Sequence, residues 1–104
     1  VHQFCRLGAY CFSALGTVIK EDVPPYVTVA GNFAQPHGLN VEGLRRHGFD
    51  TDRIAAIRRA YKTLYRHQLR FEEALEQLAL QAHASPDVRR LLEFLQQSQR
   101  GIVR

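Results

Sequence analysis

The sequence lacks features that define several protein classes. Its 104 residues contain only two cysteines, Cys5 and Cys11, which are too few for a disulfide framework and fit neither zinc nor redox spacing. This cysteine content favours a reducing compartment. Lys20 and its acidic neighbours interrupt the most apolar stretch, so no run approaches the roughly 20 residues of a membrane-spanning helix. We therefore expect no membrane span.

Motifs of self-contained catalytic centres are also missing. The sequence has no glycine-rich phosphate loop, nucleophile elbow or paired-carboxylate pattern. No histidine stands at a metal-ligand spacing from another histidine or a cysteine, so we expect no metal site. The histidines are His2, His37, His47, His67 and His83.

The overall composition is typical of globular proteins, and the chain is basic. Apolar residues make up 45% and charged residues 23% of the chain. A formal charge of +4 and a pI near 9.5 favour an acidic partner, which composition leaves open as nucleic acid, an anionic membrane surface, a phosphorylated ligand or an acidic protein.

The first stretch repeats every six residues. In a left-handed parallel β-helix each hexad forms one side of a triangular prism, with one aliphatic and one small residue pointing inward. The alternative is a β-hairpin over residues 4–19. The chain starts in mid-repeat, without methionine or a signal-like segment, so we expect further coils upstream. The inward positions would be Val1, Leu7, Ser13 and Ile19 (aliphatic, with serine as a defect) and Cys5, Cys11 and Thr17 (small).

Proline and glycine then mark a change of architecture. Pro24 and Pro25 break the repeat, and residues 26–30 predict one last strand. Gly31, Pro36 and Gly38 predict a loop. We place a boundary near Gln35, between terminal coils of a β-helix (1–35) and a helical carboxy-terminal domain (36–104).

Four helices are predicted after this boundary. Asn40 caps the first, which Gly48 stops, and Asp50 or Thr51 caps the second. Ser85 with Pro86 starts the fourth. Beyond residue 95 the pattern fades into a frayed tail. The expected spans are 41–47, 51–67, 71–83 and a fourth helix from 86 to about 95.

A basic stripe runs along the second predicted helix. Arg58, Lys62 and Arg66 lie four residues apart and so share one face. Such a stripe can attract an acidic surface, or it can simply be a solvated helix face.

One run is specific enough to indicate a family: Pro-His-Gly-Leu-Asn-Val-Glu-Gly-Leu-Arg-Arg-His-Gly-Phe, residues 36–49. Together with residues 1–5, 22–26 and 60–66, it resembles the bacterial UDP-N-acetylglucosamine acyltransferases over essentially the whole chain. The resemblance implies a cytoplasmic homotrimer of left-handed β-helices with helical carboxy-terminal domains. It also implies transfer of a 3-hydroxyacyl group from acyl carrier protein to the 3-hydroxyl of UDP-N-acetylglucosamine, the first step of lipid A biosynthesis.

The acyl donor would be the phosphopantetheine of the carrier protein, with no separate cofactor and no nucleic acid as partner. In the family the general base is a histidine on a coil that precedes residue 1. We therefore expect no catalytic residue in this chain, and no activity from the chain alone.

The resemblance also implies site residues. His2 and Gln3 would lie in the nucleotide-sugar site, and Asn40, Glu42 and Arg46 would bind the nucleotide. Without the family, His2 is a structural corner residue, Asn40 a helix cap, and Glu42 with Arg46 an exposed pair. His47 stands where relatives commonly carry a second arginine.

Two further roles follow from the resemblance. Leu15 falls at the end of the acyl groove, where some relatives have glycine, so the parent enzyme should prefer a shorter acyl chain. Arg58, Lys62 and Arg66 would dock the acidic carrier protein. The competing functions are a non-catalytic basic helical module that binds nucleic acid, and a different hexapeptide-repeat acyltransferase.

Overall fold

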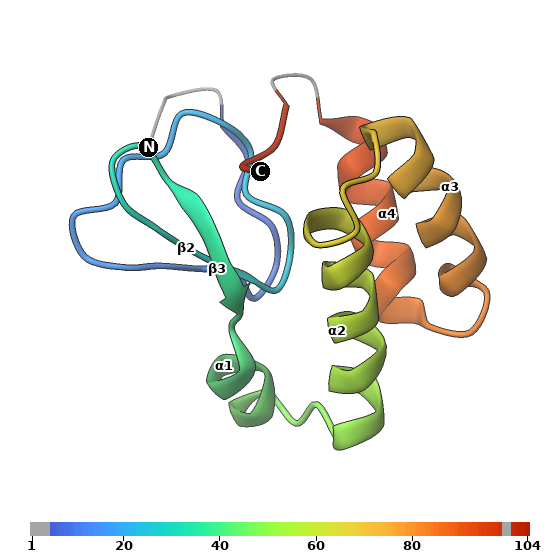
Figure 1. Ribbon diagram of the computed structural model, residues 1–104. Coiled ribbons are helices and arrows are strands. Elements are labelled where there is room, and N and C mark those ends of the chain that lie inside the picture. Colours follow the sequence, from blue (N-terminus) through green and yellow to red (C-terminus); the bar gives the residue numbers. More distant parts are fainter. Residues whose placement is uncertain (1–4, 99–100) are drawn as a thin grey trace.

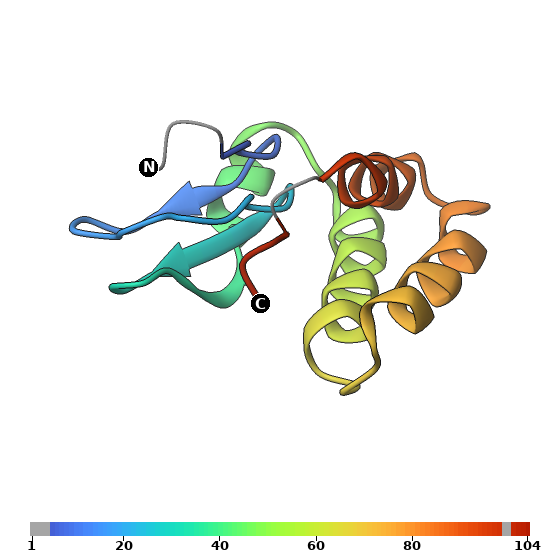
Figure 2. The same ribbon diagram turned by 90° about the horizontal axis from the view of Figure 1, so that it is seen from above.

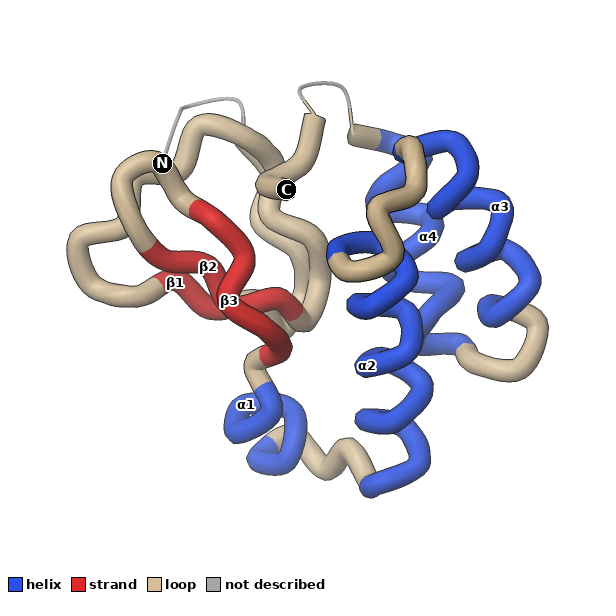
Figure 3. The backbone as a smooth tube through the Cα atoms, in the orientation of Figure 1, coloured by secondary structure: helices blue, strands red, loops and turns tan. Residues whose placement is uncertain are grey.

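The computed structural model describes residues 5–98 and 101–104. A small sheet and irregular coils form one side of the molecule, and three packed helices form the other (Figures 1 and 3). In chain order the elements are β1 (Phe12–Ser13), β2 (Val27–Ala30), β3 (Gln35–Leu39), α1 (Val41–Arg46), α2 (Thr51–Tyr65), α3 (Phe71–Ala82) and α4 (Pro86–Gln97).

The first part of the chain winds as two stacked coils. Parallel pairs join Leu7 to Val23, Phe12 to Thr28 and Val18 to Asn32, so each partner lies 16, 16 and 14 residues further along the chain. The three pairs fall on successive segments, as three sides of a prism require. Figure 2 shows the coils layered one above the other. The pairing confirms the coil interpretation of residues 5–19 and rules out the hairpin.

The coil interior is small and is open on the side of the first coil. Ile19, Val23, Val27 and Val29 are buried, and Cys5 and Cys11 pack against them. Leu7 pairs in parallel with the buried Val23, and Ser13 pairs in parallel with the buried Val29, so both lie on the interior side of the coil as predicted. Leu7 is nevertheless 51% exposed, and Ser13 is also exposed. They are exposed because the first coil is paired with the second coil on one edge and has no described strand on its other edge.

Residues 35–39 form a strand where a loop was expected. β3 runs antiparallel to β2, with Val27 opposite Leu39 and Ala30 opposite Gln35. It is an edge strand, where the missing N–H of Pro36 is tolerated. The loop prediction was therefore wrong. The boundary near Gln35 stays a prediction, and β3 lies on its helical side.

The helices begin and end close to the predicted positions. Backbone N–H groups donate to the capping side chains of Asn40, Asp50 and Ser85, and Gly48 adopts φ +85° after α1. α2, α3 and α4 lie side by side in Figures 1 and 2. They close one core around residues that are nearly free of solvent contact, among them Ile57, Leu64, Leu78, Val88 and Leu95.

The carboxy-terminal tail is anchored, which corrects the expectation that it frays. Ile102 and Val103 are 6% and 1% exposed. Asp22 N–H donates to the Gly101 carbonyl (2.9 Å), and Val103 N–H donates to the Asp22 carbonyl (2.8 Å). Tyr65 Oη also donates to the Val103 carbonyl (2.7 Å). Burial of two aliphatic side chains and these three bonds outweigh the entropy of a free tail.

Candidate functional site

Asn40 joins β3 to α1 and also holds the first coil. Its Oδ1 accepts from Gly43 N–H (3.2 Å) and its Nδ2 donates to the Tyr10 carbonyl (3.1 Å). A Cβ on residue 43 would lie 2.3 Å from Asn40 Nδ2, so a larger residue at this position would displace the Asn40 side chain from these contacts. The helix-cap interpretation of Asn40 is confirmed. Its nucleotide contact stays a prediction, for which the side chain has one further N–H.

Glu42 and Arg46 form an exposed ion pair across one turn of α1, as the alternative interpretation expected. An exposed pair of this kind contributes only about 0.2–1 kcal/mol, so an anionic ligand can draw Arg46 away at little cost. His47 is engaged within the chain: Nδ1 lies 2.7 Å from the Gly43 carbonyl oxygen, and the ring meets Tyr10 edge-on at 5.1 Å. Of the predicted nucleotide-binding residues on α1, Arg46 thus supplies the cation that an anionic ligand can recruit.

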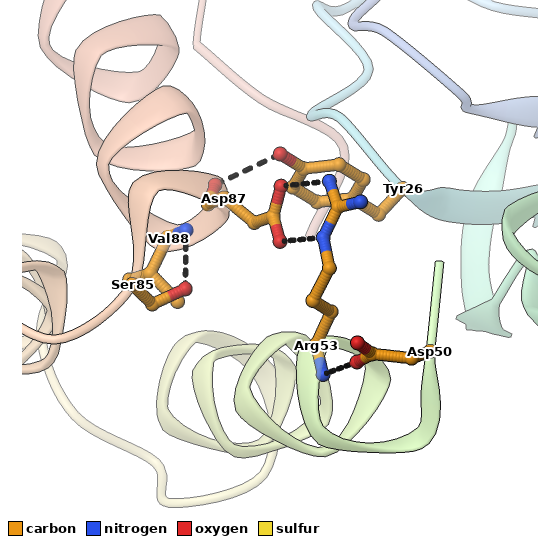
Figure 4. Close-up of polar contacts among 6 residues, drawn as sticks. All are labelled: Tyr26, Asp50, Arg53, Ser85, Asp87 and Val88. Atoms are coloured by element: carbon orange, nitrogen blue, oxygen red, sulfur yellow. Dashed lines mark hydrogen bonds and ion pairs between the residues drawn. The ribbon is translucent and has the colours of Figure 1, made fainter. Parts of the chain in front are cut away.

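A partly buried junction fixes α2 and the second coil against α4 (Figure 4). Arg53 donates two hydrogen bonds of 2.9 Å to the Asp87 carboxylate. Tyr26 Oη donates to the Asp87 carbonyl (2.8 Å), and the Arg53 guanidinium lies 3.7 Å from the centre of the Phe49 ring. Burial, with the nearby Asp87 charge, raises the pKa of Tyr26 well above its ordinary value. The hydrogen bonds that Arg53 donates to the Asp87 carboxylate raise the pKa of Arg53.

Sequence reasoning missed this junction. Arg53 and Asp87 stand 34 positions apart, and each looks like an ordinary first-turn residue of its own helix. The signal that points to a partner is the burial of Asp87, because charged residues are rarely buried unless they are paired. That burial is not visible in the sequence.

The remaining predicted residues of the coil lie apart from these contacts. His2 and Gln3 are outside the described residues. Leu15 lies in a turn next to Gly16 (φ +79°) and is fully exposed. Its place in an acyl groove therefore stays a prediction.

A basic cleft of about 270 Å³ lies between β3 and α2. Arg58 also lines a neighbouring hollow of about 460 Å³ beside Arg45 and Asp50. In residues 5–98 and 101–104, no carboxylate lies within ion-pair distance of the three cations of this cleft. The residues that line it are Gly38, Leu39, Arg58, Tyr61, Lys62 and Arg66.

The structure thus brings the three predicted docking residues together and adds Tyr61, which the sequence placed only on an apolar helix face. Tyr61 is 7% exposed, and its Oη accepts from Gly38 N–H (2.8 Å). Within the described ranges, no group of three histidine, cysteine, aspartate or glutamate side chains could hold a metal ion. No helix among the described residues has the length and apolar character to cross a membrane.

Comparisons with known proteins agree with this architecture. Residues 22–103 match the family model described as UDP N-acetylglucosamine O-acyltransferase, domain 2. The whole chain is 53% and 50% identical to proteins of Halorhodospira halophila and Alkalilimnicola ehrlichii, each named acyl-(acyl-carrier-protein)-UDP-N-acetylglucosamine O-acyltransferase. The chain spans 40% of the length of each.

A solved structure gives the same result. The UDP-N-acetylglucosamine acyltransferase of Francisella novicida superposes on 99% of this chain and 38% of its own, with a TM-score of 0.96 and 38% identity.

The stacked parallel coils followed by packed helices define the end of a left-handed β-helix of the hexapeptide-repeat transferase class, with its helical carboxy-terminal region. Within that class the match is specific. The chain belongs to the UDP-N-acetylglucosamine O-acyltransferase family, of which it covers the carboxy-terminal part.

Proposed function

We propose that the protein containing this chain transfers a 3-hydroxyacyl group from acyl carrier protein to the 3-hydroxyl of UDP-N-acetylglucosamine, the first step of lipid A biosynthesis, in the cytoplasm. The observation that carries the proposal is 53% identity over all 104 residues to a protein named for this reaction. The phosphopantetheine of the carrier holds the acyl group, and no other cofactor takes part.

The chain contributes binding groups to this reaction. Asn40, Glu42 and Arg46, together with His2 and Gln3, bind the nucleotide sugar. The weak Glu42 pair supports this role for Arg46, because a diphosphate is a stronger partner for a guanidinium than an exposed carboxylate is.

Arg58, Lys62 and Arg66 dock the acidic carrier protein. Their clustering around one cleft, without carboxylate partners in the described part of the chain, supports this role because three cations close together attract an acidic surface. The common surface of the three side chains also makes a purely solvated helix face the weaker explanation.

The active assembly is a homotrimer, and this chain alone is inactive because the histidine base lies on a coil that precedes residue 1. Exposed apolar residues of the coils support burial against other copies or coils. The largest are Leu7, Phe12, Leu15 and Phe33, with exposed fractions of 51%, 52%, 106% and 54%.

The test is an acyl-transfer assay on the isolated chain and on the chain restored upstream, each with its mass measured as a native assembly. We expect a trimer that acylates UDP-N-acetylglucosamine only after restoration. Activity in the isolated chain would contradict the placement of the base. Tight salt-dependent duplex binding without acyl transfer would instead favour the basic interaction module.

A further inference from the structure

The basic cleft between β3 and α2 has the features of a built anion site rather than a charged surface alone. Arg58 and Lys62 come from successive turns of α2, Arg66 is the C-cap residue of the same helix, and all three line one hollow of about 270 Å³. Their opposite wall is the backbone of Gly38 and Leu39 at the end of β3. The cleft therefore lies between a strand and a helix that the hydrogen bond from Gly38 N–H to Tyr61 Oη joins.

Tyr61 adds a neutral hydrogen-bond donor to this cleft. The ring is buried, and Oη accepts from Gly38 N–H at 2.8 Å. That bond uses a lone pair of the oxygen and leaves its proton free, since the hydroxyl has no acceptor in the described part of the chain. The cleft thus combines two guanidinium groups, one ammonium group and one phenol, all of which can donate, with no carboxylate among its lining residues.

We propose that this cleft binds a phosphate group. A tetrahedral phosphate has three or more acceptor oxygens and can use several of these donors at once, whereas a carboxylate has two oxygens. Leu39 and the largely buried Tyr61 also line the cleft, and their carbon atoms offer apolar contact for the organic part of a phosphate ester. Free phosphate and a phosphate ester share this chemistry, and their relative affinities distinguish the two sources.

This site does not rest on the catalytic assignment. It uses cations that we also assign to carrier docking, so the two roles predict competition: phosphate should raise the Michaelis constant for the carrier protein. The site is distinct from α1, because Asn40, Glu42 and Arg46 are not among the residues that line the cleft.

The direct test is calorimetric titration of the full-length protein with inorganic phosphate and with glycerol 3-phosphate, at about 0.15 M ionic strength. We expect saturable binding with a Kd of about a millimolar, weakened about two- to fivefold by each of Arg58→Gln and Arg66→Gln. Tyr61→Phe should weaken it by about tenfold, since a hydrogen bond to a charged acceptor is lost.

The matched control is Arg59→Gln, which removes the next cation of α2, a residue that does not line the cleft. This variant should bind phosphate with unchanged affinity. Tighter binding of glycerol 3-phosphate than of phosphate would identify an ester as the ligand, and equal affinity would identify free phosphate.

Four outcomes would overturn the proposal: no saturable binding, equal weakening by Arg59→Gln, acetate binding as tightly as phosphate, or loss of binding in Arg46→Gln with no effect of Arg58→Gln. Carrier docking has a separate readout. A raised Michaelis constant for the carrier in Arg58→Gln, with phosphate affinity unchanged, would retain docking and reject the phosphate site.

Discussion

The helical region closes its core within the chain, and the coil region does not. Leu44, Ile57, Leu64 and Leu78 are at most 1% exposed, whereas Leu7 and Phe12 of the first coil are about half exposed. A helix bundle can satisfy its backbone within each helix, but a coil of a β-helix needs a neighbour on each edge. The comparison shows why the same sequence can specify one region fully and the other only as part of a stack.

The two regions are nevertheless joined through exchanged side chains. Tyr26 leaves the second coil to pack in the helical core, while Tyr61 of α2 and Val103 of the tail pack in the coil cluster. Because each core contains residues from the other region, we expect the chain to unfold in one cooperative transition.

The largest effect should come from the helical core. Leu78→Ala should lower the free energy of unfolding by about 2–5 kcal/mol, because it leaves a cavity in a site with no solvent contact. Urea unfolding measures this change. Leu80→Ala, on the same helix at a residue 66% exposed, is the control and should stay within about 0.5 kcal/mol. If Leu7→Ala cost as much as Leu78→Ala, the contrast between the regions would be wrong.

The tail should rank next. Val103→Ala should cost about 1–3 kcal/mol, because two buried methyl groups are removed from the coil cluster. The matched variant Val18→Ala, at a residue 37% exposed, should cost clearly less. If urea unfolding showed equal and negligible losses of unfolding free energy for the two variants, the tail would contribute nothing to stability and would be frayed, as its sequence suggests.

Tyr26→Phe should cost about 0.5–1.5 kcal/mol, since the Asp87 carbonyl loses its donor. Because burial raises the folded-state pKa of Tyr26 above the unfolded value of about 10, the stabilisation is complete below pH 10 and decreases as pH rises above it. Unfolding free energies measured from pH 8 to 11 should therefore fall less steeply in Tyr26→Phe. If the unfolding free energies of the unaltered chain and of Tyr26→Phe fell in parallel over this pH range, ionisation of Tyr26 would not contribute to the pH dependence of stability.

The smallest effect on stability should come from Leu15→Gly, within about 0.5–1 kcal/mol, because the side chain is fully exposed in a turn. In the full-length enzyme the same change should shift preference toward longer acyl donors. The measurement is kcat/KM for donors of several chain lengths. An unchanged ratio of long to short donors would exclude Leu15 from the acyl groove.

Local signals explain what the sequence predicted well. Helix caps such as Asn40 and Ser85, and the left-handed Gly48, interact with residues only a few positions away. The six-residue repeat likewise reflects the length of one side of the prism, which is also a local property. These signals placed the four helices and the coils. The basic stripe also placed three cations on one helix face.

Long-range contacts explain what was missed. β3 contains Pro36 and Gly38, which locally favour a loop, and becomes a strand only because β2 offers a free edge. The tail is ordered by Asp22, about 80 positions earlier in the chain. The hydrogen bond that Tyr61 Oη accepts from Gly38 N–H joins residues 23 positions apart, and helical periodicity does not predict it.

The end of the stack also has a consequence for behaviour in concentrated solution. A solenoid with an open last rung could polymerise by joining another copy end to end. Here β3 reverses direction beneath β2, and the Asp22 to Ile102 bridge occupies the edge of a second side. At that end the described residues therefore offer an antiparallel strand and an occupied bridge in place of an open parallel rung, and we expect copies to stack end to end less readily there.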